Sequence, residues 1–124
     1  MAKFQTCRRC GNLIELICDG GAPLSCCGQP MEPLRPNTAE AAGEKHLPVA
    51  SVESSLVRVN VGSVGHPMTS EHLIQWVYLQ TRHGAQRKQL QPGQPPEAAF
   101  RLEDDQAQAV YSYCNLHGLW EAQL

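Results

Sequence analysis

Hydrophobic and polar residues alternate over positions 57–61, where Val57, Val59 and Val61 are separated by polar side chains. This period of two is typical of a β-strand that buries one face. From Leu47 onward, short segments of this kind recur between polar turns. We therefore expect most of the chain to be built of strands.

Residues 72–80 are rich in β-branched and aromatic types and end shortly before a turn signal at residues 82–84. This composition favours another strand. The same residues also fit a helix with Leu73, Trp76 and Val77 on its buried face, and this is the competing prediction.

Three further strands are predicted over residues 87–90, 98–102 and 107–114. Polar or turn-forming residues separate them, including an acidic run at residues 103–105. Strands at about ten-residue intervals with polar turns are typical of an antiparallel β-sandwich.

Residues 1–36 form a separate unit that is rich in cysteine and in turn-forming residues, with one short strand predicted over residues 13–17. A segment of this size cannot bury enough apolar surface to offset its chain entropy, so a metal or a partner chain must stabilise it. Residues 38–43 follow a proline-containing linker and favour one or two helical turns. We expect an all-β chain, with a small module over residues 1–36 and a sandwich over residues 37–124.

The chain has 124 residues, with ten Lys and Arg against twelve Asp and Glu, a formal net charge of −2. The scattered cations argue against nucleic-acid or anionic-membrane partners, because phosphate contacts demand a basic face. No apolar run approaches the ~18 residues of a membrane helix, and the first residues contain no signal-peptide core. A soluble, cytoplasmic protein is expected.

Five of the six cysteines fall in the first 27 residues. Cys7 and Cys10 share one turn, whose backbone N–H groups can point at thiolates, and Cys26 and Cys27 are adjacent. Clustered thiols of this kind indicate metal ligands before disulfides, and four thiolates select tetrahedral zinc or iron. A purely structural zinc site fits equally well. Cys18 is the odd thiol, either a buried small residue or an exposed one.

A second metal site is indicated by the histidines together with the sixth cysteine. Cys114 precedes His117 by three positions in a loop after a predicted strand, so one turn can bring a thiolate and an imidazole to one metal. Each histidine taken alone is more simply a surface or core side chain. The five histidines are His46, His66, His72, His83 and His117.

Six motifs follow one another between about residue 4 and about residue 121. They are Cys7-x2-Cys10-Gly11-Asn12, Cys26-Cys27-Gly28-x-Pro30-Met31, Glu44-Lys45-His46-x-Pro48-Val49, Gly62-Ser63-Val64-x-His66-Pro67-Met68, Glu71-His72, and Tyr113-Cys114-Asn115-Leu116-His117-Gly118-Leu119-Trp120. In this order and without large gaps, the chain resembles desulfoferrodoxin, the two-iron class of superoxide reductase.

The resemblance implies two iron sites. The first lies in a desulforedoxin-like module, with ligands Cys7, Cys10, Cys26 and Cys27. The second lies in an immunoglobulin-like antiparallel β-sandwich, with ligands His46, His66, His72, His117 and an axial Cys114. In the family the last of these histidines binds through Nδ1 and the others through Nε2. His83 and Cys18 match no ligand position, and ligand type alone leaves zinc possible in the tetrathiolate site.

The resemblance also implies a reaction, in which one electron and two protons convert superoxide to hydrogen peroxide without release of oxygen. Lys45 is implied to attract superoxide and to place a water for protonation, and Glu44 to ligate the oxidised iron after peroxide leaves. A rubredoxin-like protein or a reductase is the implied electron donor, and a homodimer the implied assembly. Two other functions fit parts of the sequence: a rubredoxin-like electron-transfer protein, and a zinc-stapled binding module without chemistry.

Overall fold

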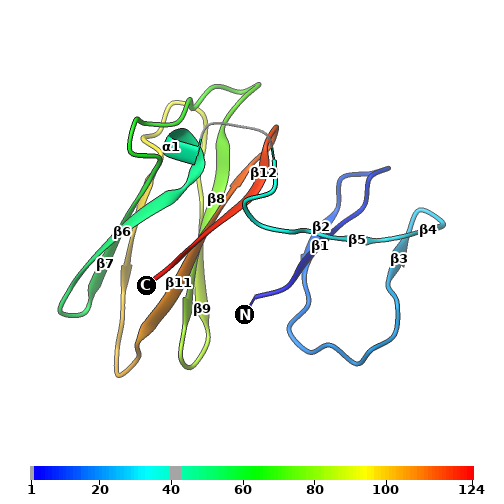
Figure 1. The fold of residues 1–124 in the computed structure, drawn as a ribbon, viewed down its shortest axis with the longest axis horizontal. Helices are drawn as coiled ribbons and strands as arrows, with labels where there is room; N and C mark the ends of the chain where they lie inside the picture. Colours follow the sequence, from blue (N-terminus) through cyan, green and yellow to red (C-terminus); the bar gives the residue numbers. More distant parts are fainter. Residues whose placement is uncertain (1, 40–42) are drawn as a thin grey trace. The chain divides into compact units, whose positions relative to one another are not determined.

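A computed structural model of the chain contains two units, Met1–Arg35 and Pro36–Leu124. It describes residues 2–39 and 43–124, with the backbone alone at Glu44. The first unit runs from blue to cyan in Figure 1, and the second from cyan to red. None of the helices in these described residues is both long enough and apolar enough to cross a membrane.

The first unit consists of very short strands. Its sheet has the order β2-β1-β5, and a separate hairpin pairs β3 with β4, all antiparallel. The strands are β1 (Phe4–Thr6), β2 (Leu13–Glu15), β3 (Ser25–Cys26), β4 (Gln29–Pro30) and β5 (Glu32–Pro33). The strand expected over residues 13–17 is present but ends at Glu15, because the chain bends at Ile17, whose side chain is 86% exposed.

Very little apolar surface is buried in this unit. Among its described residues, the buried hydrophobic side chains are Phe4 and Cys7. Two buried side chains cannot offset the entropy lost on ordering some 35 residues. The fold of this unit therefore depends on something other than a hydrophobic core.

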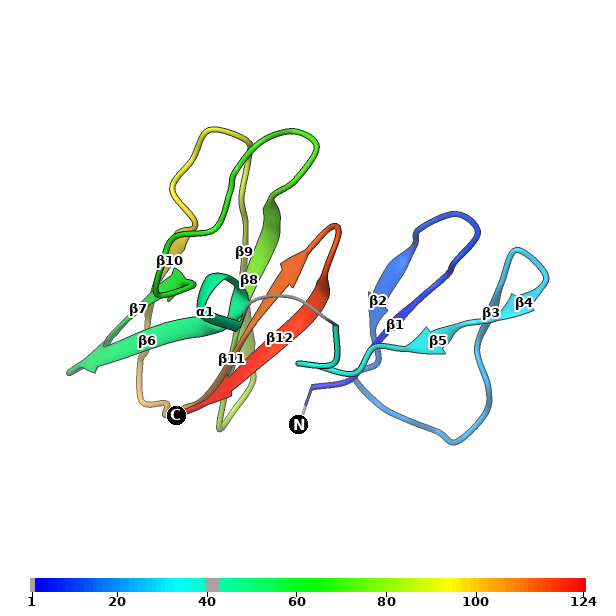
Figure 2. The same ribbon diagram turned by 45° about the horizontal axis from the view of Figure 1, so that its top comes forward.

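The second unit is a sandwich of two antiparallel sheets (Figure 2). One sheet has the order β10-β7-β6, and the other has the order β12-β11-β8-β9. The strands are β6 (Pro48–Glu53), β7 (Leu56–Val61), β8 (Ile74–Thr81), β9 (Ala85–Gln89), β10 (Glu97–Arg101), β11 (Ala107–Cys114) and β12 (Gly118–Gln123). The prediction of an all-β chain with an antiparallel sandwich is confirmed.

The sandwich core follows the predicted alternation. Val57, Val59 and Val61 on β7 are fully or almost fully buried, while Arg58 and Asn60 between them are exposed. Residues 74–81 form strand β8, so the strand prediction is confirmed there and the competing helix is wrong. The core cluster also includes Ile74, Val77, Leu79, Leu90, Phe100, Val110 and Cys114.

The one helix in the described residues is α1 (Gly43–His46), which Figure 1 shows at one end of the sandwich. A short helix was expected over residues 38–43. Thr38 and Ala39 are not helical, residues 40–42 lie outside the described residues, and the helix begins at Gly43, the residue expected to end it. Four residues cannot sustain a helix alone, so tertiary contacts must hold it.

Candidate metal centres

The four N-terminal cysteines converge on one point. The sulfur atoms of Cys7, Cys10, Cys26 and Cys27 all lie within 4.8 Å of one another. Cys10 Sγ is 3.5 Å from Cys26 Sγ, and Cys26 Sγ is 4.0 Å from Cys27 Sγ. With zinc–sulfur bonds of about 2.3 Å, the sulfur atoms of a tetrahedral site lie about 1.6 bond lengths apart, about 3.8 Å, and these two separations lie on either side of that value. The cluster therefore has the size of a four-thiolate metal site.

Two turns produce this arrangement. In the first, the N–H of Gly11 donates to the carbonyl of Cys7 at 2.9 Å, and the N–H of Cys7 donates to the carbonyl of Asn12 at 2.8 Å. In the second, Cys27 and Gly28 both have positive φ, 53° and 73°. Two successive left-handed residues turn the chain sharply, which lets adjacent cysteines face the same point.

Neighbouring groups shift the pKa of Cys7 and the pKa of Cys27 in opposite directions. The backbone N–H of Cys10 lowers the pKa of Cys7 to about 6, while hydrogen bonding with Cys10 and then Cys26 raises the pKa of Cys27 to about 12. The pKa of Cys26 is also raised, chiefly by Cys10 and Cys7. Several thiolates at one point repel one another without a cation. A bound metal cation removes this repulsion, so the donor set fits a metal.

A second convergence lies in the sandwich. The ligand atoms of His46, His72, Cys114 and His117 lie within 4.8 Å of one another. His46 Nε2 is 3.0 Å from His117 Nδ1, and Cys114 Sγ is 3.8 Å from that same Nδ1. His117 thus presents Nδ1 to the centre of the group and His46 presents Nε2.

His66 is outside that group of four but packs against two of its members. Its ring centre is 4.6 Å from that of His46 and 4.7 Å from that of His72, both edge to face. Its Nδ1 lies 2.7 Å from the carbonyl of Pro67. Because a carbonyl only accepts, Nδ1 carries the proton and Nε2 keeps a free lone pair, the tautomer found in metal-ligating histidines.

Two buried nitrogen atoms at this site have no hydrogen-bond partner, His66 Nε2 and His72 Nε2. Buried polar atoms are nearly always paired, so each orphan requires an explanation. Burial is the main cause that lowers the pKa of both imidazoles, to about 4 for His66, with smaller effects from the neighbouring histidines. A neutral imidazole whose nitrogen has a free lone pair can coordinate a metal ion, so these residues fit a metal site.

Four segments bring these side chains together. His46 is the last residue of α1, His66 lies in the connection from β7 to β8, His72 precedes β8, and the remaining two flank the turn from β11 to β12. Cys114 ends β11 and is fully buried, whereas His117 is partly exposed. The site is thus built from the ends of α1 and β11 and from the loops beside them, at one end of the sandwich.

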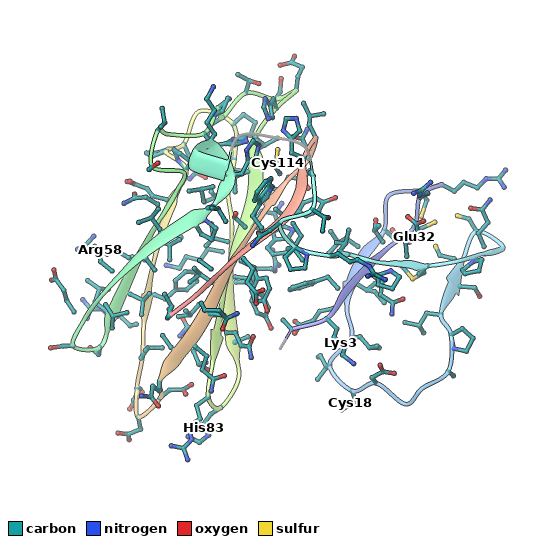
Figure 3. All side chains as sticks on the ribbon, viewed as in Figure 1. Lys3, Cys18, Glu32, Arg58, His83 and Cys114 are labelled. Carbon is teal, nitrogen blue, oxygen red and sulfur yellow. The ribbon has the colours of Figure 1, made fainter. Side chains whose placement is uncertain are left out.

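Two candidate residues stand apart from these clusters. Figure 3 shows His83 and Cys114 at opposite ends of the sandwich. It also shows Cys18 on a loop away from Glu32, and the Cys18 thiol is exposed. Lys45 is exposed and close enough to the second site to contribute to lowering the pKa of His72. The side chain of Glu44, the other predicted catalytic residue, lies outside the described residues.

The sequence analysis did not find the residues that support the ligands. Trp120 stacks on His46 with ring centres 5.0 Å apart and donates its indole N–H to the carbonyl of His117 at 3.2 Å. Ser112, its cross-strand partner, donates its hydroxyl to the carbonyl of His46 at 3.1 Å. The motif around Cys114 contained Trp120, but only the fold shows what its ring touches.

Comparison with known proteins supports the motif-based resemblance. Residues 38–123 match the family model for desulfoferrodoxin, and residues 2–34 match the model for the desulfoferrodoxin N-terminal domain. The chain belongs to the desulfoferrodoxin family. The expected membership is thereby confirmed over both parts of the chain.

Individual relatives and solved structures show how much of the chain is similar. The desulfoferrodoxin of Syntrophotalea carbinolica is 46% identical, covering 94% of this chain and 92% of the relative. The crystal structure of the superoxide reductase from Treponema pallidum is 40% identical with a TM-score of 0.83, covering 99% of each chain. A one-iron superoxide reductase from Giardia intestinalis, 33% identical with a TM-score of 0.57, covers 65% of this chain and 97% of its own.

Proposed function

We propose that this desulfoferrodoxin is a superoxide reductase. The observation that supports this most strongly is the convergence of three imidazoles and one thiolate within 4.8 Å, beside a fourth imidazole with a buried, unpaired Nε2. One superoxide, one electron and two protons give one hydrogen peroxide, so no oxygen is released. The related structures from Treponema pallidum and Giardia intestinalis, both named superoxide reductases, support the same activity.

The proposed ligands of the catalytic iron are His46, His66, His72, Cys114 and His117. Iron held there would supply the electron that reduces superoxide. Cys114 contributes a buried thiolate, a strong electron donor, while the imidazoles are neutral, so Cys114 is the only negatively charged donor among the five proposed ligands. Few negative charges around the iron matter because the substrate is itself an anion.

Lys45 is the proposed attractor of superoxide. The Lys45 side chain is exposed, yet electrostatic repulsion from its charge helps to lower the pKa of the His72 imidazole. A cation beside the site raises the local concentration of an anionic substrate and increases its association rate. Lys45 Nζ also offers protons, or holds a water that does, for the two that peroxide requires. Glu44 is proposed, from the family resemblance, as an additional carboxylate ligand that would hold the oxidised form of the iron.

The N-terminal cluster is proposed to hold a second iron on Cys7, Cys10, Cys26 and Cys27, with zinc as the alternative metal. A redox-active metal there can pass electrons toward the catalytic site, and the donor is proposed to be a rubredoxin-like protein or a reductase. We further propose a homodimer, since the small module buries few apolar side chains of its own. Clustered metal-ligating thiols are typical of proteins in a reducing compartment, which supports a cytoplasmic location. The proposed removal of superoxide supports a role against oxidative stress.

Metal content per chain, measured on protein purified without oxygen, tests the proposed sites. The proposal predicts two irons, a tetrathiolate absorption spectrum and an additional thiolate band on oxidation of the second site. Zinc alone, after growth with ample iron, would leave only a structural module. Iron at the tetrathiolate site alone would leave a rubredoxin-like electron carrier.

A further inference from the structure

His72 lies in the turn just before β8 and has no sheet partner of its own. Its Nε2 is buried and without a hydrogen-bond partner, and its ring centre lies 5.2 Å from that of His117. A ligand in a turn must be fixed by its neighbours, because a metal site loses affinity when one donor is misplaced.

The turn itself is fixed by Thr69. The Thr69 hydroxyl accepts from the N–H of His72 at 3.0 Å, and the Thr69 N–H donates to the carbonyl of His72 at 2.9 Å. Both bonds join residues three positions apart. They set the shape of the turn but not its distance from Cys114.

Regular sheet pairing does not set that distance either. Strands β8 and β11 pair in regular register from Ala109 and Gln80 to Tyr113 and Trp76, but the register shifts before Cys114 meets Ile74. A bulge of this kind disrupts the ladder at the point where the ligand must be placed. Beyond the bulge one backbone bond joins the two ligand-bearing segments, from the N–H of Asn115 to the carbonyl of Leu73 at 3.3 Å, and it holds only the residue after His72. The residue before His72 needs another connection.

The side chain of Asn115 makes that connection. Its Oδ1 accepts from the N–H of Leu73 at 3.0 Å, and its Nδ2 donates to the carbonyl of Glu71 at 2.9 Å. Glu71 and Leu73 are the residues immediately before and after His72. A primary amide offers an acceptor and a donor at once, so a single side chain bonds the backbone on both sides of the ligand.

We propose that Asn115 is a positioning residue that holds His72 within reach of the metal bound by its own neighbours, Cys114 and His117. Asn115 follows Cys114 directly, so the two hydrogen bonds tie His72 to the thiolate-bearing loop. This inference rests on the proposed iron site. Asn115 itself is not a ligand and takes no part in proton or electron transfer.

The test compares three variants of the full chain, each loaded with ferrous iron without oxygen. Asn115→Ala removes both bonds, and Asn115→Asp keeps the acceptor for Leu73 but loses the donor to Glu71. Asn37→Gly is the matched control, because Asn37 makes an equivalent pair of bonds with the backbone of Glu121, at 2.8 and 3.1 Å. Asn37 has a positive φ of 61°, which glycine tolerates without strain.

The measurements are the rate of ferrous iron loss to a chelator and the thiolate absorption band after oxidation. We expect Asn115→Ala to lose iron from the His/Cys site about 10- to 100-fold faster than the unaltered protein, with a shifted band. The rate of iron loss from Asn115→Asp should lie between those of Asn115→Ala and the unaltered protein, and the rate from Asn37→Gly should equal that of the unaltered protein. The tetrathiolate site of the same chain is the internal reference and should be unchanged.

Retention of iron by Asn115→Ala at the unaltered rate, with the same band, would overturn the proposal. If Asn115→Ala does not fold, the rate of iron loss from Asn115→Asp decides between support and refutation, since this variant keeps the bond from Leu73 and nearly the shape of the asparagine side chain. Equal iron loss from Asn37→Gly would show that general loosening of the sandwich, and not the position of His72, controls the rate. Absence of a second iron from the unaltered protein would overturn the proposed function and this inference with it.

Discussion

Gly62 is the position where a single methyl group should have the largest effect on the site. Its φ is +79°, and a Cβ built there would lie 2.5 Å from the carbonyl oxygen of Lys45 and 2.7 Å from the carbonyl carbon. The N–H of Gly62 donates to the carbonyl of Leu47 at 2.8 Å. The end of β7 thus packs directly on the backbone of α1, which contains Lys45 and His46.

Two costs follow for Gly62→Ala. A left-handed backbone conformation costs alanine about 1–2 kcal/mol, and forcing extra volume into a packed contact costs about 1–3 kcal/mol. We therefore expect a loss of about 2–5 kcal/mol in the free energy of unfolding. The Lys45 carbonyl must also retreat by about 0.5 Å, since Cβ contacts under 3.0 Å are essentially never seen.

Gly93→Ala is the matched control. Gly93 has a similar φ of +87° and a comparable N–H bond, to the Met68 carbonyl at 2.9 Å, but a Cβ there would meet nothing within 4 Å. It should cost only the conformational part, about 1–2 kcal/mol. Urea unfolding followed by tryptophan fluorescence reports on the sandwich, because both tryptophans, Trp76 and Trp120, lie in it.

Equal losses of stability in the two variants would refute the reasoning, since the contact with Lys45 would then contribute nothing. A larger loss for Gly62→Ala, together with slower reaction with superoxide, would support it. Gly93→Ala should leave that reaction unchanged.

Three further predictions concern charge and ligands. Lys45→Ala should slow association with superoxide and flatten its dependence on ionic strength in pulse radiolysis; an effect no larger than that of Lys88→Ala, which removes the same charge elsewhere, would exclude steering by Lys45. Cys114→Ser should abolish superoxide reduction while the tetrathiolate spectrum stays unchanged, and wild-type turnover would contradict a role for the thiolate. The pKa of Asp105 is held below the usual aspartate value of 3.8, first by the Thr81 hydroxyl, so this carboxylate contributes stability that is present above that pH and lost as the pH falls through the lower folded-state pKa. Asp105→Asn should therefore lose less stability than the unaltered protein between about pH 5 and pH 2 in acid unfolding, and parallel curves would contradict this.

The strands that follow a period of two could be predicted from the sequence. Val57, Val59 and Val61 alternate strictly because one face of β7 meets the core and the other meets solvent. Strand β12 was not among the individually predicted strands, because Leu119 and Trp120 are adjacent and both buried. Alternation disappears where both faces of a strand are covered.

The position of the short helix depends on contacts that are distant in sequence. Residues 38–43 contain good local helix signals, yet the described helix is Gly43–His46. The backbone of its last residue is held by Ser112, 66 positions away, and its third residue packs on Gly62. Tertiary contacts override local propensity in so short an element.

The residues of the site likewise fall into ligands, which the sequence could identify, and supporting residues, which it could not. Ligand residues are recognisable because metals need particular donor atoms, so cysteine and histidine spacing leaves a pattern in the sequence. Supporting residues leave none, since any asparagine or tryptophan has many uses. Asn115 and Trp120 are identified only by the atoms they reach, at Glu71, Leu73, His46 and His117.

The product ratio of the reaction tests the central claim most directly. The iron-loaded protein is supplied with superoxide and an excess of a one-electron donor, and hydrogen peroxide and oxygen are both measured. A reductase predicts one hydrogen peroxide for each superoxide consumed, one electron taken from the donor and no oxygen. Half as much peroxide, accompanied by oxygen and no donor oxidation, would show dismutation and contradict the account.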